Sequence, residues 1–369
     1  MTTVFLTGFP GFLGSALVER LLERYDASDE IACLIQSAYR EEAESRANDL
    51  LSAVGTDTVD TDPTIRLYEG DITEPDLGLD AATADRLQSE TVEVFHLAAV
   101  YDLGVPEDVG RAVNVRGTDH VLDFAEACPD LDRFQYVSTC YVSGRYDGVF
   151  TEEMLREGQS FNNWYEATKF LAEVEVQRRM ADGLPATIYR PAIAVGDSET
   201  GETQKYDGPY FVLRWLLRQP SLAVLPLPPG ADEFEINVVP RDFVVDAIAH
   251  LSGLQTSEGV VYQLADPNPP TVAELSRLLA DAADRRLLAV PTTHGVAKRS
   301  LASVPGLQWL MGIEPEAVNY FTHPTRYTSG HTLRDLSGTD IGCPHFGSYV
   351  DTLVEFVRQN PEIDSSAMV

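Results

Sequence analysis

The stretch TVFLTGFPGFLGSALVERLL, residues 3–22, decides the fold class. It opens with an apolar run typical of a buried strand and continues, near Phe12, into a helical pattern. The junction holds three glycines: Gly8, Gly11 and Gly14. Glycine allows a tight turn there and lets backbone N–H groups approach a pyrophosphate at the N-terminus of the helix. A glycine triplet alone is often only a turn, but its place between a strand and a helix predicts dinucleotide binding.

The same alternation of short apolar runs and longer helical patterns continues through the first half of the chain. Strands are predicted over residues 3–7, 31–36, 64–70, 92–99, 133–139 and 186–192. Helices are predicted between them, over residues 12–25, 40–54, 80–89, 107–127 and 161–182. The strands are apolar through most of their length, as parallel strands covered on both faces are. The pattern predicts an α/β fold with a doubly wound parallel sheet of the Rossmann type.

The alternation loosens after residue 192, where prolines cluster and helices come to predominate towards the C-terminus. We therefore expect the chain to form two parts. Residues 1–192 plus 236–265 form the predicted NAD(P)-binding Rossmann domain, and residues 193–235 plus 266–369 form a smaller, mostly helical C-terminal substrate lobe. An aromatic-rich stretch of that lobe, KYDGPYFVLRW, is a candidate lining for an apolar pocket, although core packing is the alternative.

The charge of the chain restricts its partners. The 369 residues include 58 acidic and 27 basic ones, which gives a net charge of −31. Only three of the basic residues are lysine: Lys169, Lys205 and Lys298. Self-repulsion of this size is screened at molar ionic strength, so the composition predicts a protein adapted to a salt-rich cytosol, as in a halophile. A chain this acidic repels nucleic acid and anionic lipid surfaces, so neither is an expected partner.

Other features indicate a cytoplasmic protein. The four cysteines are scattered without paired spacing, as expected in a reducing compartment. The N-terminus lacks the basic and then apolar pattern of a signal peptide. The most apolar later stretch, residues 209–229, is interrupted by Arg214, Arg218 and several prolines, so no membrane span is expected.

The end of the second predicted strand bears on the choice of cofactor. An acidic residue there would hold the ribose 2′-hydroxyl of NAD, but this chain has Gln36 and Ser37. Arg40 and Arg46 follow on the next predicted helix, where a guanidinium would reach a 2′-phosphate through bidentate hydrogen bonds. Alternatively, both arginines pair only with neighbouring glutamates on a solvated helix face. We expect NADP(H) as the preferred cofactor, with NAD(H) as the alternative.

Tyr165 and Lys169 are four residues apart and so share one face of a predicted helix. An ammonium group beside a phenol stabilises the phenolate and lowers the pKa of the phenol towards the range useful for proton transfer. A lysine retained in a chain that otherwise uses arginine indicates a chemical role, because a primary amine reaches ribose hydroxyls and the phenol together. The alternative is an exposed lysine beside a half-buried tyrosine. Ser138 and Thr139, at the end of a predicted strand, are candidates to polarise a substrate carbonyl.

Several motifs together resemble those of the extended short-chain dehydrogenases/reductases. They are TGFPGFLG (7–14), GDI (70–72), HLAA (96–99), NVRGT (114–118), YVSTCYVSG (136–144), YEATK (165–169) and RPAIAVG (190–196). They follow the order of that family over roughly residues 1–265. Within the family, GDITEPDLGLD followed by HLAAVYDL is most similar to fatty acyl-CoA reductases and thioester-reductase domains.

The resemblance implies roles for individual residues. Thr139, Tyr165 and Lys169 match the catalytic hydroxyl, the proton donor and acceptor, and the ribose-binding amine of the family. Further matches are Asp71 and Ile72 at the adenine, Ala98 and Ala99 at the middle of the cofactor, Pro191 and Ile193 at the nicotinamide, and Asn114 as a support of the site. The full set of residues expected to bind the cofactor is Thr7, Gly8, Pro10, Gly11, Phe12, Leu13, Gly14, Gln36, Ser37, Arg40, Asp71, Ile72, Leu97, Ala98, Ala99, Asn114, Val137, Ser138, Tyr165, Lys169, Pro191 and Ile193.

The expected function is that of an NADP(H)-dependent oxidoreductase acting on an apolar acyl thioester, aldehyde or ketone. Two alternatives are a nucleotide-sugar epimerase or dehydratase that uses bound NAD, and a non-enzymatic dinucleotide sensor. Because members of the family often form dimers, a homodimer is a further expectation. No metal site is predicted, since the spacings of the candidate ligands His323, His331, Cys343 and His345 match no zinc pattern. His96, at the end of an apolar strand, is expected to be structural.

Overall fold

A computed structural model describes residues 2–26, 28–53, 64–292 and 317–363. Its centre is a parallel sheet of seven strands in the order β11-β7-β5-β4-β1-β2-β3. The strands are β1 (Thr3–Thr7), β2 (Glu30–Ile35), β3 (Thr64–Glu69), β4 (Thr91–His96), β5 (Arg133–Val137), β7 (Ala186–Pro191) and β11 (Val261–Leu264). The first six have the predicted positions to within three residues at each end. The predicted fold class is confirmed.

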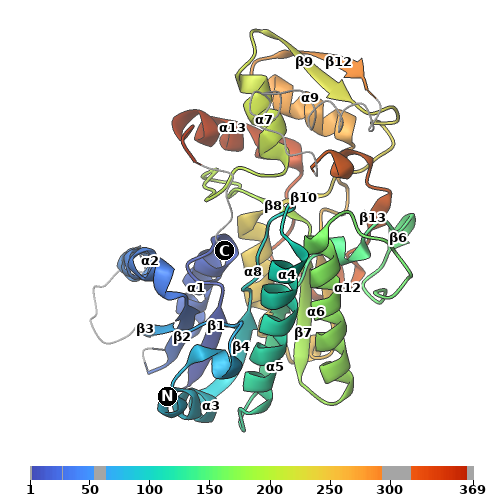
Figure 1. Ribbon diagram of the computed structural model, residues 1–369. Coiled ribbons are helices and arrows are strands. Elements are labelled where there is room, and N and C mark those ends of the chain that lie inside the picture. The colour runs from blue at the N-terminus through green and yellow to red at the C-terminus, as the bar shows by residue number, and fades with distance from the viewer. Residues whose placement is uncertain (1, 27, 54–63, 293–316, 364–369) are drawn as a thin grey trace.

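Helices cover both faces of this sheet (Figure 1). One face carries α1 (Phe12–Arg24), α2 (Arg40–Ala53) and α8 (Arg241–Ser252), and the other carries α3 (Ala81–Glu90), α5 (Thr118–Glu126) and α6 (Trp164–Ala181). Strand β2 shows why its sequence is apolar throughout. Ile31, Cys33 and Ile35 enter the core on the α1 face, whereas Ala32 and Leu34 enter the core on the α6 face. Successive side chains of a strand point to opposite faces, so a strand covered on both faces buries all of them.

The helix predicted over residues 107–127 is not one regular helix. The structure has α4 (Glu107–Gly110), then a π-helical turn, η3 (Arg111–Gly117), and only then α5. Such turns are rare and occur frequently at functional sites. The last predicted helix, α6, begins three residues later than expected, because the Asn163 side chain caps its first turn.

A second core lies beyond the carboxyl ends of the central strands (Figure 1). It is built mainly from α7 (Pro209–Leu217), α9 (Val272–Ala282) and α13 (Val350–Gln359), with a parallel strand pair, β9 (Leu222–Leu227) and β12 (Arg286–Pro291), at its edge. A further short pair, β8 (Ile193–Val195) and β10 (Val238–Pro240), connects this part to the sheet. The strand β9 was not predicted, because its segment is rich in proline. The division of the chain into two domains stays a prediction.

The C-terminal segment returns to the free edge of the sheet. Strand β13 (Thr325–Tyr327) pairs with β6 (Gly148–Phe150), and α12 (Gly330–Asp335) then packs beside β11. Over the four described ranges of the chain, no helix combines the length and the apolar character that crossing a membrane would require.

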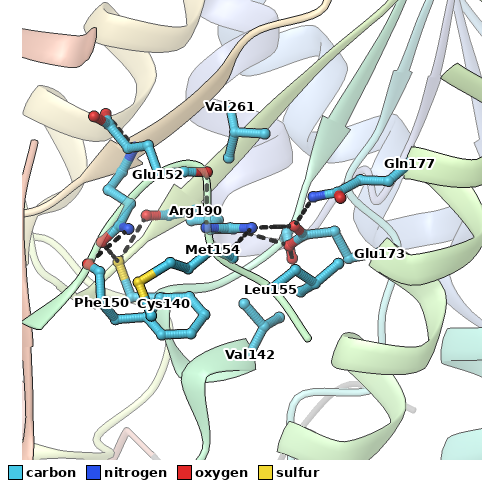
Figure 2. A network of polar contacts seen from close by, with 12 residues as sticks. Cys140, Val142, Phe150, Glu152, Met154, Leu155, Glu173, Gln177, Arg190 and Val261 are labelled. Carbon is cyan, nitrogen blue, oxygen red and sulfur yellow. Dashed lines mark hydrogen bonds and ion pairs between the residues drawn. The ribbon is translucent and has the colours of Figure 1, made fainter. Parts of the chain in front are cut away.

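A buried ion network joins α6 to β7 (Figure 2). The Arg190 guanidinium donates to the Glu173 carboxylate, with 2.6 Å between Nη2 and Oε1, and both side chains are fully buried. Glu173 also accepts hydrogen bonds from Ser138 Oγ, at 2.6 Å, and from Gln177 Nε2, at 3.0 Å. The guanidinium additionally reaches two backbone carbonyls in the segment after β6, one of them that of Glu152. The network therefore fixes the middle of α6 against the end of β7, and its central ion pair is fully buried.

Candidate active site

The glycine loop joins β1 to α1 at the centre of the sheet. Gly8 has a φ of +97°, and a Cβ atom there would lie 2.9 Å from the backbone nitrogen of Ala98. A Cβ atom on Gly14 would lie 2.2 Å from the carbonyl oxygen of Gly8, a distance that real Cβ atoms do not show. Gly11 is the N-cap of α1 and puts no side chain over its first turn, so a pyrophosphate can approach the N–H groups there. The other predicted residues of this loop lie in or beside it: Thr7, Pro10, Phe12 and Leu13.

The substitution Gly14→Ala is expected to weaken the binding of a nicotinamide dinucleotide by about tenfold or more, because the added methyl group pushes the Gly8 carbonyl out of the loop. A fluorescence titration with NADPH and with NADH measures the change. Gly253→Ala is the matched control, since a Cβ atom there would have its nearest neighbour at 3.4 Å. Equal affinities of the two variants would contradict a pyrophosphate site at this loop.

His96, at the carboxyl end of β4, forms a chain of hydrogen bonds behind the loop. The Thr7 hydroxyl accepts from the N–H of Ala98, at 3.2 Å, and donates to His96 Nδ1, at 2.7 Å. On the other side, His96 Nε2 donates to Thr118 Oγ1, at 3.0 Å, and that hydroxyl donates to a backbone carbonyl of η3. The pattern requires a neutral imidazole, and burial together with the Lys169 ammonium lowers the pKa of His96 to about 3. Nδ1 therefore holds Thr7 and, through it, Ala98, while Nε2 ties the imidazole to Thr118.

Tyr165, in the first turn of α6, lies beside Thr139, which follows β5. The two side chains share a hydrogen bond, and Thr139 Oγ1 also lies 3.4 Å from the carbonyl oxygen of Pro191. Burial raises the pKa of Tyr165, and the hydrogen bond with Thr139 opposes that shift only in part. The lowered pKa predicted from the neighbouring Lys169 is thus wrong, because removal of the phenol from water outweighs other effects. At neutral pH Tyr165 is a protonated phenol, which suits a proton donor.

Lys169 lies one helical turn further along α6 and is also buried. Its ammonium group donates to the carbonyl oxygen of Val137, at 2.9 Å, and lies 4.5 Å from the centroid of the Tyr136 ring. Burial lowers the pKa of Lys169 to about 7, and the Glu173 carboxylate partly opposes the shift. The ammonium is thus held at the carboxyl end of β5. Keeping it charged there costs free energy, because the group is buried.

The lowered pKa of Lys169 predicts that the protein becomes more stable as pH rises from 7 to 8.5. In that window the unfolded chain, with an ordinary lysine pKa, binds a proton that the folded chain has released, so the free energy of unfolding increases with pH. The contribution is at most about 1.4 kcal/mol per pH unit. Urea unfolding at several pH values measures it, and Lys169→Met should remove this part of the slope. Parallel stability curves for the two proteins would contradict a lowered pKa.

Asn114 lies within the π-helical turn η3 and ties two elements together. Its Oδ1 accepts from the N–H of Val100, at 2.9 Å, and its Nδ2 donates to Thr168 Oγ1, at 3.0 Å. Val100 belongs to the loop after β4, and Thr168 precedes Lys169 in α6. Asn114 therefore holds this loop against the helix that carries Tyr165 and Lys169.

The residues predicted at the 2′-position of the adenosine ribose lie at the surface. Gln36 is partly exposed, and Ser37 and Arg40 are exposed, just beyond β2. Arg40 forms ion pairs with Glu44, at 2.8 Å, and with Glu69, at 2.7 Å. The Glu44 pair is that of the alternative interpretation, in which the arginines pair with glutamates of their own helix. Glu69 instead lies on β3, and Arg46 pairs with Glu202, at 3.7 Å. Exposed pairs of this kind contribute little free energy, so they do not prevent Arg40 from turning to a phosphate.

The remaining predicted residues are distributed along the carboxyl edge of the sheet. Asp71 and Ile72 follow β3; Leu97, Ala98 and Ala99 follow β4; Val137 and Ser138 lie at the end of β5; and Pro191 and Ile193 lie at β7 and β8. Ser138 differs from the others, because its hydroxyl donates to Glu173 and so belongs to the buried ion network. Its hydroxyl is therefore already engaged with a buried carboxylate.

A pocket of about 570 Å³, counted to its mouth, lies beside Tyr165. Its lining consists of Tyr101, Leu103, Tyr141, Tyr165, Ile193, Gly208, Pro209, Phe211, Ile236, Tyr320 and Phe321, none of which is charged. Residues near the sheet and residues of the second core both contribute. The stretch KYDGPYFVLRW does supply part of the wall, as the sequence suggested. Tyr101, Tyr141 and Tyr320 were missed, because no local pattern indicates that these distant segments meet.

The candidate metal ligands do not converge. Within the described ranges, no group of three or more histidine, cysteine, aspartate or glutamate side chains could hold a metal ion. His323 is instead packed among tyrosine rings, and burial lowers its pKa to about 3. His331 lies 3.2 Å from a carboxylate oxygen of Glu153.

Over residues 6–248, well over half of the chain, the sequence matches the family described as male sterility protein. The chain belongs to this family. Among curated relatives of this family member, a linear gramicidin synthase from Brevibacillus parabrevis is 30% identical over 384 residues, which cover 94% of this chain and 7% of that protein. Fatty acyl-CoA reductase wat from Drosophila melanogaster is 28% identical over 278 residues, which cover 66% of this chain and 53% of that protein. The family member thus spans less than two thirds of either relative.

A solved structure shares the whole fold of this male sterility family member. The terminal R domain from the myxalamid PKS-NRPS biosynthetic pathway superposes with a TM-score of 0.82 and 26% identity, over 99% of this chain and 92% of that one. The resemblance to extended short-chain dehydrogenases/reductases of the fatty acyl-CoA reductase and thioester-reductase type is confirmed. The same matches support the expected enzyme class, an NAD(P)-dependent oxidoreductase.

Proposed function

We propose that this chain is an NADP(H)-dependent reductase that acts on the carbonyl carbon of an apolar acyl thioester or of an aldehyde or ketone. One observation carries the proposal. The protonated phenol of Tyr165, hydrogen-bonded to Thr139, forms part of the wall of a pocket whose lining is apolar and aromatic. A proton donor in an uncharged pocket suits a substrate that accepts a proton on one oxygen and is otherwise apolar.

The glycine loop fits a dinucleotide, because Gly8 and Gly14 leave the space that a pyrophosphate and its close approach to the backbone require. When bound, the nicotinamide supplies the hydride. The preference for NADP(H) is supported by the absence of a carboxylate at Gln36 and Ser37 and by the exposed Arg40 nearby.

The residues of the chain supply the rest of the reaction. Thr139 and Tyr165 donate hydrogen bonds to the carbonyl oxygen of the substrate, where negative charge develops as a C–H bond forms. Tyr165 transfers its proton to that oxygen. With a thioester, the C–S bond of the resulting hemithioacetal then breaks, which releases a thiol and an aldehyde. The Lys169 ammonium, one turn from Tyr165, holds the ribose and stabilises the phenolate that remains.

The epimerase alternative is less well supported. A nucleotide sugar carries a diphosphate, which proteins bind with arginine, lysine or a helix N-terminus. The lining of the pocket offers no cation to it. A non-enzymatic sensor would have no use for a buried phenol, hydroxyl and ammonium that meet at the edge of the sheet.

An assay of NADPH oxidation against acyl-CoA esters, aldehydes, ketones and UDP-sugars, at low and at molar salt, tests the proposal. We expect loss of nicotinamide absorbance with apolar thioesters or aldehydes and slower loss with NADH. Conversion of a sugar nucleotide by an enzyme that retains NAD, with no net change in absorbance, would instead establish the epimerase reaction.

A further inference from the structure

Lysine is nearly absent from this chain, yet the two lysines in the described ranges both contact the site. Lys205, in the segment that leads to α7, contacts a carbonyl oxygen and a tyrosine ring, as Lys169 does. Its ammonium donates to the carbonyl oxygen of Tyr101, at 3.1 Å, and lies 4.8 Å from the centroid of the Tyr101 ring. The third contact is a carboxylate, since Lys205 Nζ lies 3.4 Å from Asp207 Oδ2. The proposed reaction assigns no role to this second lysine.

Tyr101 connects Lys205 to the phenol of the site. Its ring meets that of Tyr165 edge-on, with 4.9 Å between centroids and 80° between planes. Tyr101 also lines the pocket, although it is 37% exposed. Lys205 and Tyr165 therefore contact the same ring, and both contacts bear on how Tyr101 lies at the pocket.

The residues that precede and follow Lys205 both contact other parts of the site. Gln204 Nε2 donates to the carbonyl oxygen of Pro10 in the glycine loop, at 3.4 Å. On the other side, Gly208 and Pro209 form part of the pocket wall. The backbone that carries Lys205 is therefore fixed relative to both the cofactor loop and the pocket.

We infer that Lys205 is a positioning residue, which holds Tyr101 edge-on against Tyr165 and so closes the rim of the pocket around the phenol. The inference rests on the proposed function of Tyr165. Closing the rim matters for proton transfer, because water at the phenol weakens its electrostatic contacts with the substrate and competes for its proton.

These contacts explain why position 205 carries lysine rather than arginine. A compact ammonium directs three N–H groups at once, towards a carbonyl oxygen, a carboxylate and the face of a ring. The N–H groups of a guanidinium all lie in one plane, so a single nitrogen of it cannot direct donors in three directions. Asp207 depends on the same cation, since burial raises the pKa of its carboxyl group and Lys205 opposes that shift.

A double-mutant cycle tests the inference in the full chain, with Lys205→Met, Tyr101→Ala and the double variant. We expect each single change to lower kcat/KM for a neutral acyl N-acetylcysteamine thioester by about tenfold, and the double change to lower it by about the same factor rather than about a hundredfold. NADPH affinity should stay within about twofold. Arg86→Met is the matched control, because it removes a similar contact with the Tyr68 ring, at 5.4 Å, away from the site.

Two outcomes would overturn the inference. Additive losses would show that Lys205 acts independently of Tyr101. A loss seen with an acyl-CoA ester but not with the neutral thioester would show that Lys205 attracts an anionic substrate instead.

Urea unfolding of the same three variants tests the Lys205–Tyr101 contact without any substrate. The result therefore does not depend on the proposed function. Loss of the cation–π contact should lower the folding equilibrium constant by about two- to fivefold in either single variant, with no further loss in the double variant. If no carbonyl substrate is reduced, the proposed function fails, and additive unfolding data would still overturn the Lys205–Tyr101 contact.

Discussion

Replacement of Tyr165 by phenylalanine is expected to lower kcat about 100- to 10,000-fold, the usual contribution of a general acid. The change removes one oxygen atom from a side chain whose hydroxyl bonds to Thr139 and faces the pocket. Cofactor affinity should change little, because the glycine loop and Lys169 are left intact. Steady-state NADPH oxidation and a fluorescence titration of the cofactor measure the two quantities separately.

The control for this prediction is Tyr146→Phe, which makes the same chemical change on a ring that packs against Phe150 outside the pocket. That variant should keep its kcat. Retention of full activity by Tyr165→Phe would show that another group donates the proton, and the assignment of the site would have to be abandoned.

The substitution Glu173→Ala is expected to have the largest effect on stability, about 3–5 kcal/mol in the free energy of unfolding. It removes the carboxylate from a fully buried guanidinium, that of Arg190, and leaves only backbone carbonyls to solvate the charge. The Ser138 hydroxyl loses its acceptor as well. Differential scanning calorimetry should show a fall in Tm of roughly 4–6 °C.

Glu175→Ala provides the comparison, because Glu175 lies on the same helix and pairs with arginines at the surface, with distances of 2.6 Å to Arg178 and 3.0 Å to Arg179. Surface pairs contribute about 0–1 kcal/mol, so the Tm of this variant should fall by only about 2 °C or less. Equal losses in the two variants would mean that burial does not govern the strength of the Glu173–Arg190 pair.

Most of the sheet could be predicted from the sequence because five of its strands are buried on both faces: β1, β2, β4, β5 and β7. These strands are largely apolar, whereas the edge strand β3 is partly exposed, and β1 is followed by glycines that the tight turn into α1 requires. The sequence contains no comparable pattern that predicts the π-helical turn η3. Within it, Asn114 reaches both Val100 and Thr168, which are distant in sequence.

The candidate site was predictable where it follows from local spacing. Tyr165 and Lys169 share a helix face, and Thr139 follows a strand that ends at the same edge of the sheet. The pKa of Tyr165 was not predictable, because it depends on burial, and neither was the contact of Lys205 with Tyr101, which joins segments 104 residues apart. The residue assignments and the salt-adapted interpretation of the composition both stay predictions.

Two parts of the molecule supply the pocket wall, and this affects how related proteins can diverge in substrate range. Tyr165 and Thr139 are fixed by the sheet, whereas Phe211, Tyr320 and Phe321 come from segments around the other core. Descendants of such a chain can therefore exchange side chains around the second core while Tyr165 and Thr139 stay where they are. Under the proposed function, new substrate ranges would then arise by substitutions in one part of the molecule, with the proton donor retained.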